Sequence, residues 1–223
     1  PDYARDKEPL PVAASHYSET LVLMRGAGVV HRLPSAASQL QRRPLSAAAA
    51  AERARPSRPF IINCPFSAQK VNFPYLRVLR SVVDRSRTAR ERGVLFRFFP
   101  YLSTKVLRLA FKKAIERALD PAASGSDSGG SDGSSEGSIS ADATSKPQAQ
   151  VSVEVYGEVK FEDYLQLMRE GDLIIEASHY GGCNTVVDAL LLGMPMLLWE
   201  GEHWYNRIGE RAACMVAACR SLS

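Results

Sequence analysis

Several features that would place a chain in a well-defined functional class are missing from this sequence. The four cysteines form no Cys-x-x-Cys pair and no spacing typical of a disulfide framework, which favours reduced thiols and a cytoplasmic or nuclear location. The four histidines are far apart, and no Asp-x-Asp pair or His/Cys cluster at ligand spacing accompanies them. We therefore expect neither a metal ion nor another cofactor.

Long apolar runs are missing as well. No stretch is long enough to cross a bilayer and no signal peptide opens the chain, so we expect no membrane partner. The first residue is Pro1 rather than a methionine, which predicts that the chain is a piece of a longer protein.

Two segments lack the aromatic residues that a packed core needs. Residues 120–150 contain nine Ser and five Gly, so they cannot bury enough apolar surface to offset the entropy of ordering, and we predict a disordered linker. Residues 34–59 are rich in Arg, Ala and Pro, and their prolines leave room only for a short helix. We interpret this second segment as a low-complexity insertion.

The formal net charge is +4, and the basic excess lies mainly along residues 77–92 and 105–117. In both stretches the basic residues alternate with apolar residues at helical spacing, which is typical of a solvated helix face. No recognised nucleic-acid-binding motif accompanies them, so we expect no nucleic-acid partner.

From residue 60 onward, apolar strands alternate with amphipathic helices. The expected strands are residues 60–64, 94–99, 151–156, 172–177 and 196–199. The expected helices are residues 75–92, 104–119 (capped by Ser103), 161–169, 184–192 and 204–219. This alternation predicts an α/β fold with a Rossmann-like parallel sheet.

The most informative motif is Gly181–Leu190, which follows the expected strand 172–177 and leads into a helix. A glycine pair lets the backbone turn tightly and approach a ligand, and the free N–H groups of the next helix favour an anion. Asn184 and Thr185 add side-chain donors, and Asp188 lies one turn below Asn184 on the same face. The motif predicts a phosphate-and-ribose site at the carboxyl end of a parallel strand.

These pieces, in this order, resemble the catalytic region of the O-linked N-acetylglucosamine transferase and SPINDLY family of glycosyltransferases. Three blocks carry the resemblance: His16–Met24, Phe60–Lys70 and Phe161–Arg211. The last block includes Asp-Ala-Leu at 188–190, Gly-x-Pro at 193–195 and a Gly and an Arg at 201 and 207. The family has two lobes of the GT-B type, with tetratricopeptide repeats ahead of the catalytic region.

The resemblance implies a division of the chain and a reaction. Residues 1–33 would end the N-terminal lobe, residues 60–119 and 151–223 would form the nucleotide-sugar-binding lobe, and 34–59 and 120–150 would be the insertion and the linker. The implied reaction moves a sugar, in the first instance N-acetylglucosamine, from a nucleotide diphosphate to Ser or Thr of acceptor proteins. Because the family's N-terminal lobe supplies a histidine and much of the acceptor surface, we expect this chain alone to bind the donor weakly and catalyse little.

The resemblance also implies roles for individual residues. Lys70 stands where the family has a lysine against the donor's diphosphate, and such a cation stabilises the leaving group without a metal. Thr185 and Asn184 stand where paired threonines hold the diphosphate, and Asp188 stands at the ribose-binding acid. The donor-binding residues implied in this way are Tyr164, Gly181, Gly182, Cys183, Asn184, Thr185 and Asp188.

Three positions depart from the family pattern. Cys183 replaces a family histidine, and Asn184 replaces the first of the family's paired threonines. Tyr164 replaces a second family histidine, one that packs beside the base of the donor. A UDP-sugar donor and a GDP-sugar donor, as in the SPINDLY branch, therefore both stay open. So do a catalytically degenerate lobe that binds a nucleotide or acts as a scaffold, and another two-lobed enzyme that acts on nucleotide sugars.

Each of these residues also has a simpler explanation. Lys70 could be an ordinary surface lysine, Asn184 could only cap a helix, Asp188 could be a solvated acid and Tyr164 could be a core residue. Among the other polar residues, His179 and the 203–205 cluster could border the cleft or serve the local structure, and Arg207 could fix its helix. Thiol chemistry at Cys183 is not expected, because no neighbouring base would activate it.

Overall fold

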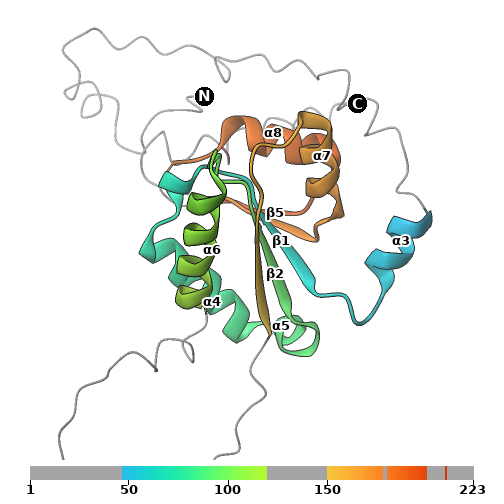
Figure 1. Cartoon of the computed structure of the whole chain (residues 1–223). Helices are drawn as coiled ribbons and strands as arrows, with labels where there is room; N and C mark the ends of the chain where they lie inside the picture. Colours follow the sequence, from blue (N-terminus) through green and yellow to red (C-terminus); the bar gives the residue numbers. More distant parts are fainter. Residues whose placement is uncertain (1–46, 120–149, 178–179, 200–208, 210–223) are drawn as a thin grey trace, which may run out of the picture.

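The computed structural model describes residues 47–119, 150–177, 180–199 and 209. It contains a five-stranded sheet in the order β3-β2-β1-β4-β5, and every strand pair is parallel (Figure 1). The strands are β1 (Phe60–Cys64), β2 (Val94–Phe98), β3 (Val151–Val155), β4 (Leu173–Ile175) and β5 (Met196–Leu197). The predicted α/β class and parallel sheet are confirmed, and the bounds of β1 are those expected.

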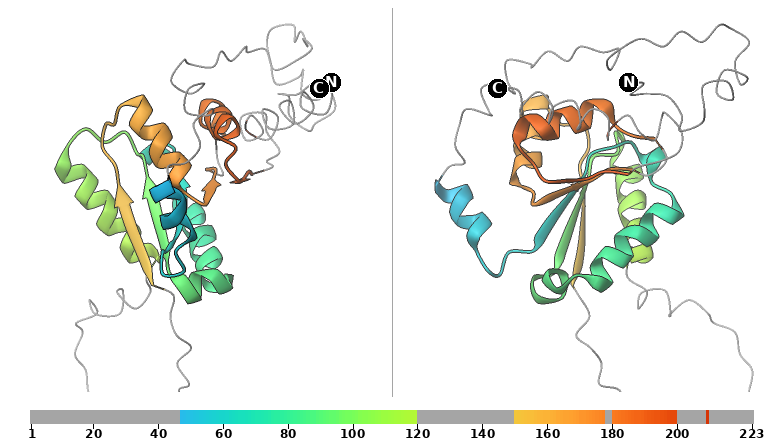
Figure 2. Two further views of the ribbon diagram at one scale, coloured as in Figure 1. Left: turned by 90° about the vertical axis from the view of Figure 1, so that its right-hand side faces the viewer. Right: turned by 180° about the vertical axis from the view of Figure 1, so that it is seen from behind.

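Helices cover both faces of the sheet (Figures 1 and 2). The described helices are α3 (Ala47–Ala54), the 3-10 turn η1 (Ala68–Lys70), α4 (Phe73–Arg85), α5 (Arg87–Arg92), α6 (Lys105–Leu119), α7 (Phe161–Glu170) and α8 (Cys183–Leu192). α4, α5 and α6 pack on one face, where Phe96 and Phe98 of β2 are fully buried. α7 and α8 pack on the other face around Met168 and Ala189. The two cores arise because side chains alternate along each strand.

One expected helix is divided in two. The apolar periodicity predicts a single helix over 75–92, but Ser86 is extended, and its hydroxyl accepts a hydrogen bond from the Ala89 N–H, which begins α5. At the start of α4, the Asn72 side chain caps the helix through the Tyr75 N–H. The cap that begins α6 is Thr104, which accepts from the Leu107 N–H, rather than the expected Ser103.

The segment expected to be a low-complexity insertion contains more structure than its composition indicates. Its alanine run forms α3, and Arg58 is only 7% exposed. Arg58 donates to a carboxylate oxygen of Asp172 at 2.7 Å, just before β4. Composition alone misses this contact because its partner is 114 residues away along the chain.

Several expected features lie outside the described residues. They are residues 1–33, the linker over 120–149, the helix over 204–219, His179, the 203–205 cluster and Arg207. Within the part that the structure describes, no helix is both long enough and apolar enough to cross a membrane.

Candidate functional site

The residues that the sequence singles out meet at the carboxyl edge of the sheet. β1 and β4 are neighbours in the sheet, so the turn η1 after β1 and the loop before α8 after β4 come together. Lys70 of η1, Gly182 of the loop and Thr185 of α8 line one pocket with Glu176 and Tyr180. The space enclosed by this pocket is about 10 Å³, room for about one water molecule. A larger ligand would have to lie over its mouth or open it.

The glycine loop places the start of α8 at this pocket. Gly182 is the N-cap residue, and a Cβ on it would overlap the Thr185 hydroxyl, so a larger residue would force Thr185 to rotate. The first N–H groups of any helix have no partner within that helix and carry the positive end of its dipole. α8 ends at Gly193, which adopts the left-handed conformation (φ 66°) and donates back to Ala189 and Leu190.

Glu176 is a site residue that the sequence interpretation missed. It follows β4, is only 7% exposed, and its Oε1 atom accepts a hydrogen bond from the Gly182 N–H at 2.6 Å. Burial raises the pKa of Glu176 to about 7, and the Gly182 and Trp199 N–H groups and Lys70 oppose that rise. The signal that could have identified it is an acidic residue directly after the apolar run Leu173–Ile175. Acidic residues are rarely buried, because burial of their charge is costly, so one at the end of a buried strand indicates a functional or paired group.

Lys70 is half-buried and lies against an aromatic ring. Its Nζ atom is 4.8 Å from the centroid of the Tyr180 ring, within cation–π range. Burial lowers the pKa of Lys70, and the charge of Glu176 partly opposes this. The structure thus places a desolvated cation beside a helix N-terminus and a buried acid, which is unlike the environment of an ordinary surface lysine.

The remaining residues of the glycine motif are arranged around the pocket rather than in it. Gly181 is buried, while Asn184 is exposed at the second position of α8. The capping alternative for Asn184 is wrong, since Gly182 holds the cap position without a side-chain hydrogen bond. Cys183 is half-buried, and both burial and the charge of Glu176 raise the pKa of its thiol. A raised pKa disfavours the thiolate, which is the reactive form of cysteine. This agrees with the prediction that Cys183 does not act as a nucleophile.

Tyr164 lies in the core between α7, α8 and the sheet. It is 9% exposed and packs edge-to-face on Phe99, with ring centroids 5.4 Å apart. Its hydroxyl group has no hydrogen-bond partner among the described residues. Burial raises its pKa, and the charge of the half-buried Asp188 adds to this rise. This placement favours the core alternative for Tyr164 over stacking on a base, and it puts Asp188 on the α8 face that looks toward α7.

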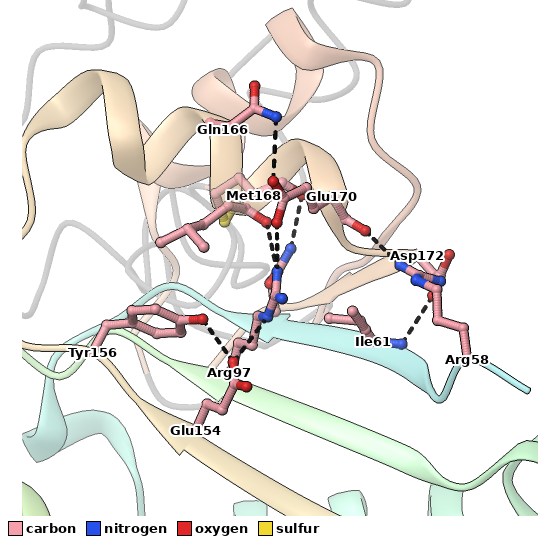
Figure 3. Close-up of polar contacts among 11 residues, drawn as sticks. Arg58, Ile61, Arg97, Glu154, Tyr156, Gln166, Met168, Glu170 and Asp172 are labelled. Carbon is pink, nitrogen blue, oxygen red and sulfur yellow. Dashed lines mark hydrogen bonds and ion pairs between the residues drawn. The ribbon is translucent and has the colours of Figure 1, made fainter. Parts of the chain in front are cut away.

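A second polar cluster lies on the face of the same sheet that α7 covers, from Arg58 and Asp172 at the amino ends of β1 and β4 to Arg97, the fourth residue of β2 (Figure 3). Arg58 binds both the Asp172 carboxylate and the Glu170 carbonyl, at 2.7 and 2.6 Å. Arg97 of β2 is paired with Glu154 at 3.2 Å and with Glu170 at 3.4 Å. A cavity of about 390 Å³ adjoins these residues. Since each of these arginines has a carboxylate partner, the cluster joins α7 and β4 to β1 and β2 rather than offering a free cation.

No group of three or more His, Cys, Asp or Glu side chains that could hold a metal ion occurs among residues 47–119, 150–177, 180–199 and 209. The expectation that no metal takes part stays a prediction.

Comparison with known proteins adds information on the fold alone. No protein-family model and no curated protein matches the sequence. Among solved structures, the chain is similar to a mutant O-GlcNAc transferase of Thermobaculum terrenum, with 16% identity and a TM-score of 0.49. It is also similar to the trehalose-6-phosphate synthase OtsA, with 8% identity and a TM-score of 0.43.

These two matches cover 75% and 84% of this chain but only 26% and 41% of the matched chains. The chain thus spans less than half the length of either structure. At such identities and TM-scores the two matches carry no argument about activity, which has to rest on the site itself.

Proposed function

We propose that this chain is the donor-binding part of a glycosyltransferase and that it binds the diphosphate of a nucleotide sugar at the carboxyl edge of the sheet. The observation that carries this proposal is the convergence of Lys70, Gly182 and Thr185 on one pocket, from segments far apart in the sequence. A lysine and a helix N-terminus that face the same space form an anion site.

The chemistry of the proposal follows from these groups. In sugar transfer, an acceptor hydroxyl attacks the anomeric carbon while the bond to the diphosphate breaks, so negative charge develops on the departing phosphate oxygen. The Lys70 ammonium and the N–H groups that begin α8 stabilise that charge because they are fixed before the reaction starts. The resemblance supports N-acetylglucosamine as the sugar, Ser or Thr of proteins as the acceptor and Asp188 as the ribose-binding group.

A second candidate is a lobe that binds a nucleotide, or acts as a scaffold, without sugar transfer. The small enclosed volume of the pocket favours this alternative, since a site that holds a diphosphate for transfer is expected to be open. A protein O-fucosyltransferase of the SPINDLY type, which would take a GDP-sugar, is also retained, because the buried Tyr164 does not specify a base.

Calorimetric titration of the whole chain with UDP-N-acetylglucosamine and with GDP-fucose tests the proposal. We expect weak binding of one of the two nucleotide sugars, and loss of that binding in Lys70→Ala and Thr185→Ala. Lys113→Ala, which removes an exposed charge from α6, is the matched control and should bind like the wild type.

The outcomes separate the candidates. Binding that Lys70→Ala abolishes supports the donor site, and the preferred nucleotide selects the branch. If neither compound binds to well-folded protein, or if Lys70→Ala binds as well as the wild type, the proposed site is wrong. Transfer to Ser- or Thr-containing peptides then separates an enzyme from a binding lobe, and efficient turnover by this chain alone would contradict the expected need for a second lobe.

A further inference from the structure

We propose that Glu176 takes part in ligand binding as a neutral carboxylic acid, whose Oε2–H group donates a hydrogen bond to a phosphate oxygen of the bound nucleotide sugar. Binding would then take up a proton from the solvent at neutral pH. This inference rests on the function proposed above and adds to it a residue that the sequence resemblance does not assign.

The two oxygens of the Glu176 carboxyl group have different surroundings. Oε1 accepts from the Gly182 N–H at 2.6 Å, and this contact ties the strand end to the loop that caps α8. Oε2 is buried and accepts no hydrogen bond of acceptable geometry from the described residues, while the Trp199 N–H lies near enough to the carboxyl group to oppose the rise of its pKa. Glu176 also lines the pocket that Lys70 and Thr185 share. A buried polar atom without a partner is costly, so its occurrence at the pocket indicates that a ligand supplies the partner.

The backbone around the carboxyl group limits its movement. A Cβ on Gly209 would overlap both carboxyl oxygens, so Gly209 packs directly against them. The Gly182 N–H holds Oε1 from the loop. Rotation of the side chain would break this short hydrogen bond, so the unpartnered Oε2 is held in one place.

Neighbouring elements determine which form of the acid is favoured. Lys70 from η1 faces Glu176 and favours the carboxylate, while Cys183 of α8 and Tyr75 of α4 lie close enough for their own ionisation to be disfavoured by its charge. Burial outweighs Lys70 and raises the pKa of Glu176 to about 7, so both forms are populated at neutral pH. A diphosphate at the same pocket adds negative charge, which shifts the population further toward the protonated acid.

The proton balance is simple. The carboxylate form binds one proton from solvent, and the resulting Oε2–H bond points at a phosphate oxygen that remains an anion. No bond of the ligand is made or broken in this step. Only the acid form offers a donor there, because the carboxylate would place two anionic oxygens against each other.

The test measures protons taken up as UDP-N-acetylglucosamine binds, or GDP-fucose if the chain selects that donor. Titrations at one pH, in buffers with different ionisation enthalpies, give the number of protons directly. A diphosphate diester has no phosphate that titrates near neutral pH, so the ligand contributes none. We expect the wild type to take up about half a proton per ligand at pH 7, because about half of Glu176 is ionised there.

Glu176→Gln replaces the acid by a neutral group of the same shape. We expect this variant to bind without the uptake seen in the wild type and to keep the same affinity from pH 6 to pH 8, a range over which wild-type affinity falls about tenfold. Glu116→Gln makes the same change on α6, outside the pocket, and should behave like the wild type.

The outcomes distinguish this inference from the function on which it rests. If the wild type binds with no proton uptake between pH 6 and pH 8, the inference is wrong and the donor site stands. The same holds if Glu176→Gln retains the uptake of the wild type. If no nucleotide sugar binds to the folded wild type in that range, the proposed function fails, and the role of Glu176 fails with it. The wild-type pH series decides the question even if Glu176→Gln does not fold.

Discussion

Two polar regions of one sheet, the arginine cluster beneath α7 and the pocket at the carboxyl edge, differ in how buried charge is paired. In the cluster beneath α7, Arg58 and Arg97 are nearly buried, and each has at least one carboxylate partner within 3.4 Å. At the carboxyl edge, Glu176 is equally buried, but one of its oxygens has no hydrogen-bond partner in the described part of the chain. Charges that stabilise a fold are paired, whereas incompletely paired groups cost stability and cluster where proteins bind ligands. This contrast distinguishes a cluster that stabilises the fold from the edge at which we propose that a ligand binds.

The largest effect is expected where the paired cluster is broken. Asp172→Ala leaves the Arg58 guanidinium buried without its carboxylate and also removes the acceptor of the Ile61 N–H. We expect a loss of about 3–5 kcal/mol in the free energy of unfolding, measured by denaturant titration. The double variant with Arg58→Ala should lose less than the sum of the two single variants. Additive losses would show that the two side chains do not interact.

The next largest effect is expected at Glu176, where substitution should increase the free energy of unfolding at high pH rather than decrease it. The pKa of Glu176 is raised from 4.5 to about 7, so its neutral form favours the folded state. That contribution is complete below pH 4.5 and is lost as pH rises through 7. Relative to Glu176→Gln, which does not titrate, the wild type should lose about 3 kcal/mol of stability over this range, at 1.36 kcal/mol per pH unit. Parallel stability–pH profiles for the two proteins would contradict the burial of this acid.

Substitution of Lys70 should weaken ligand binding and leave the stability of the fold nearly unchanged. Lys70→Ala removes the cation from the anion pocket, and a charged hydrogen bond is worth about 1.5–3 kcal/mol, so nucleotide-sugar affinity should fall about tenfold or more. Because the charge of Glu176 only partly offsets the desolvation of Lys70, we expect removal of Lys70 to leave the free energy of unfolding within about 1 kcal/mol of the wild type. A large loss of stability with unchanged affinity would assign Lys70 to the fold instead.

The smallest effect on stability is expected for Glu116→Gln, which is the control for the substitution of Glu176. Glu116 forms an exposed ion pair with Lys112 on α6, at 3.6 Å. Glu116→Gln should change stability by less than about 0.5 kcal/mol at any pH from 5 to 8, because exposed pairs contribute little. A larger, pH-dependent change would mean that a glutamate-to-glutamine substitution is not a clean probe in this protein.

Local pattern was sufficient to predict most of the sheet. β1 runs exactly over the apolar segment that Pro65 ends, and β2 stops one residue before the expected end. The proximity of Lys70 and Thr185 could also be predicted from the sequence, since parallel strands put the carboxyl ends of β1 and β4 on the same edge. The prediction of one helix over 75–92 was wrong at Ser86. The apolar spacing continues across this residue, although its extended backbone ends α4 and its side chain caps α5.

The long-range charges could not be predicted in the same way. Arg58 lies in a segment whose composition indicates an insertion, and its contact with Asp172 depends on the closure of β4 against β1. Glu176 is a single acid after a short strand, and nothing in the sequence shows that Gly182 and Gly209 enclose it. Tyr164 was assigned to the donor site through a resemblance, whereas packing against Phe99 places it in the core.

The adjacency of β1 and β4 has a consequence for how this chain acquires its site. These strands pair through Ile62 with Leu173 and Asn63 with Ile174, across a sequence separation of more than 100 residues that includes β2, α6 and β3. Such non-local pairing forms late, because the loop entropy must be lost before the contact is gained. A ligand at the proposed site between Lys70 and Thr185 would therefore bind only chains in which this pairing is complete, and its binding would draw partly folded chains toward the native state.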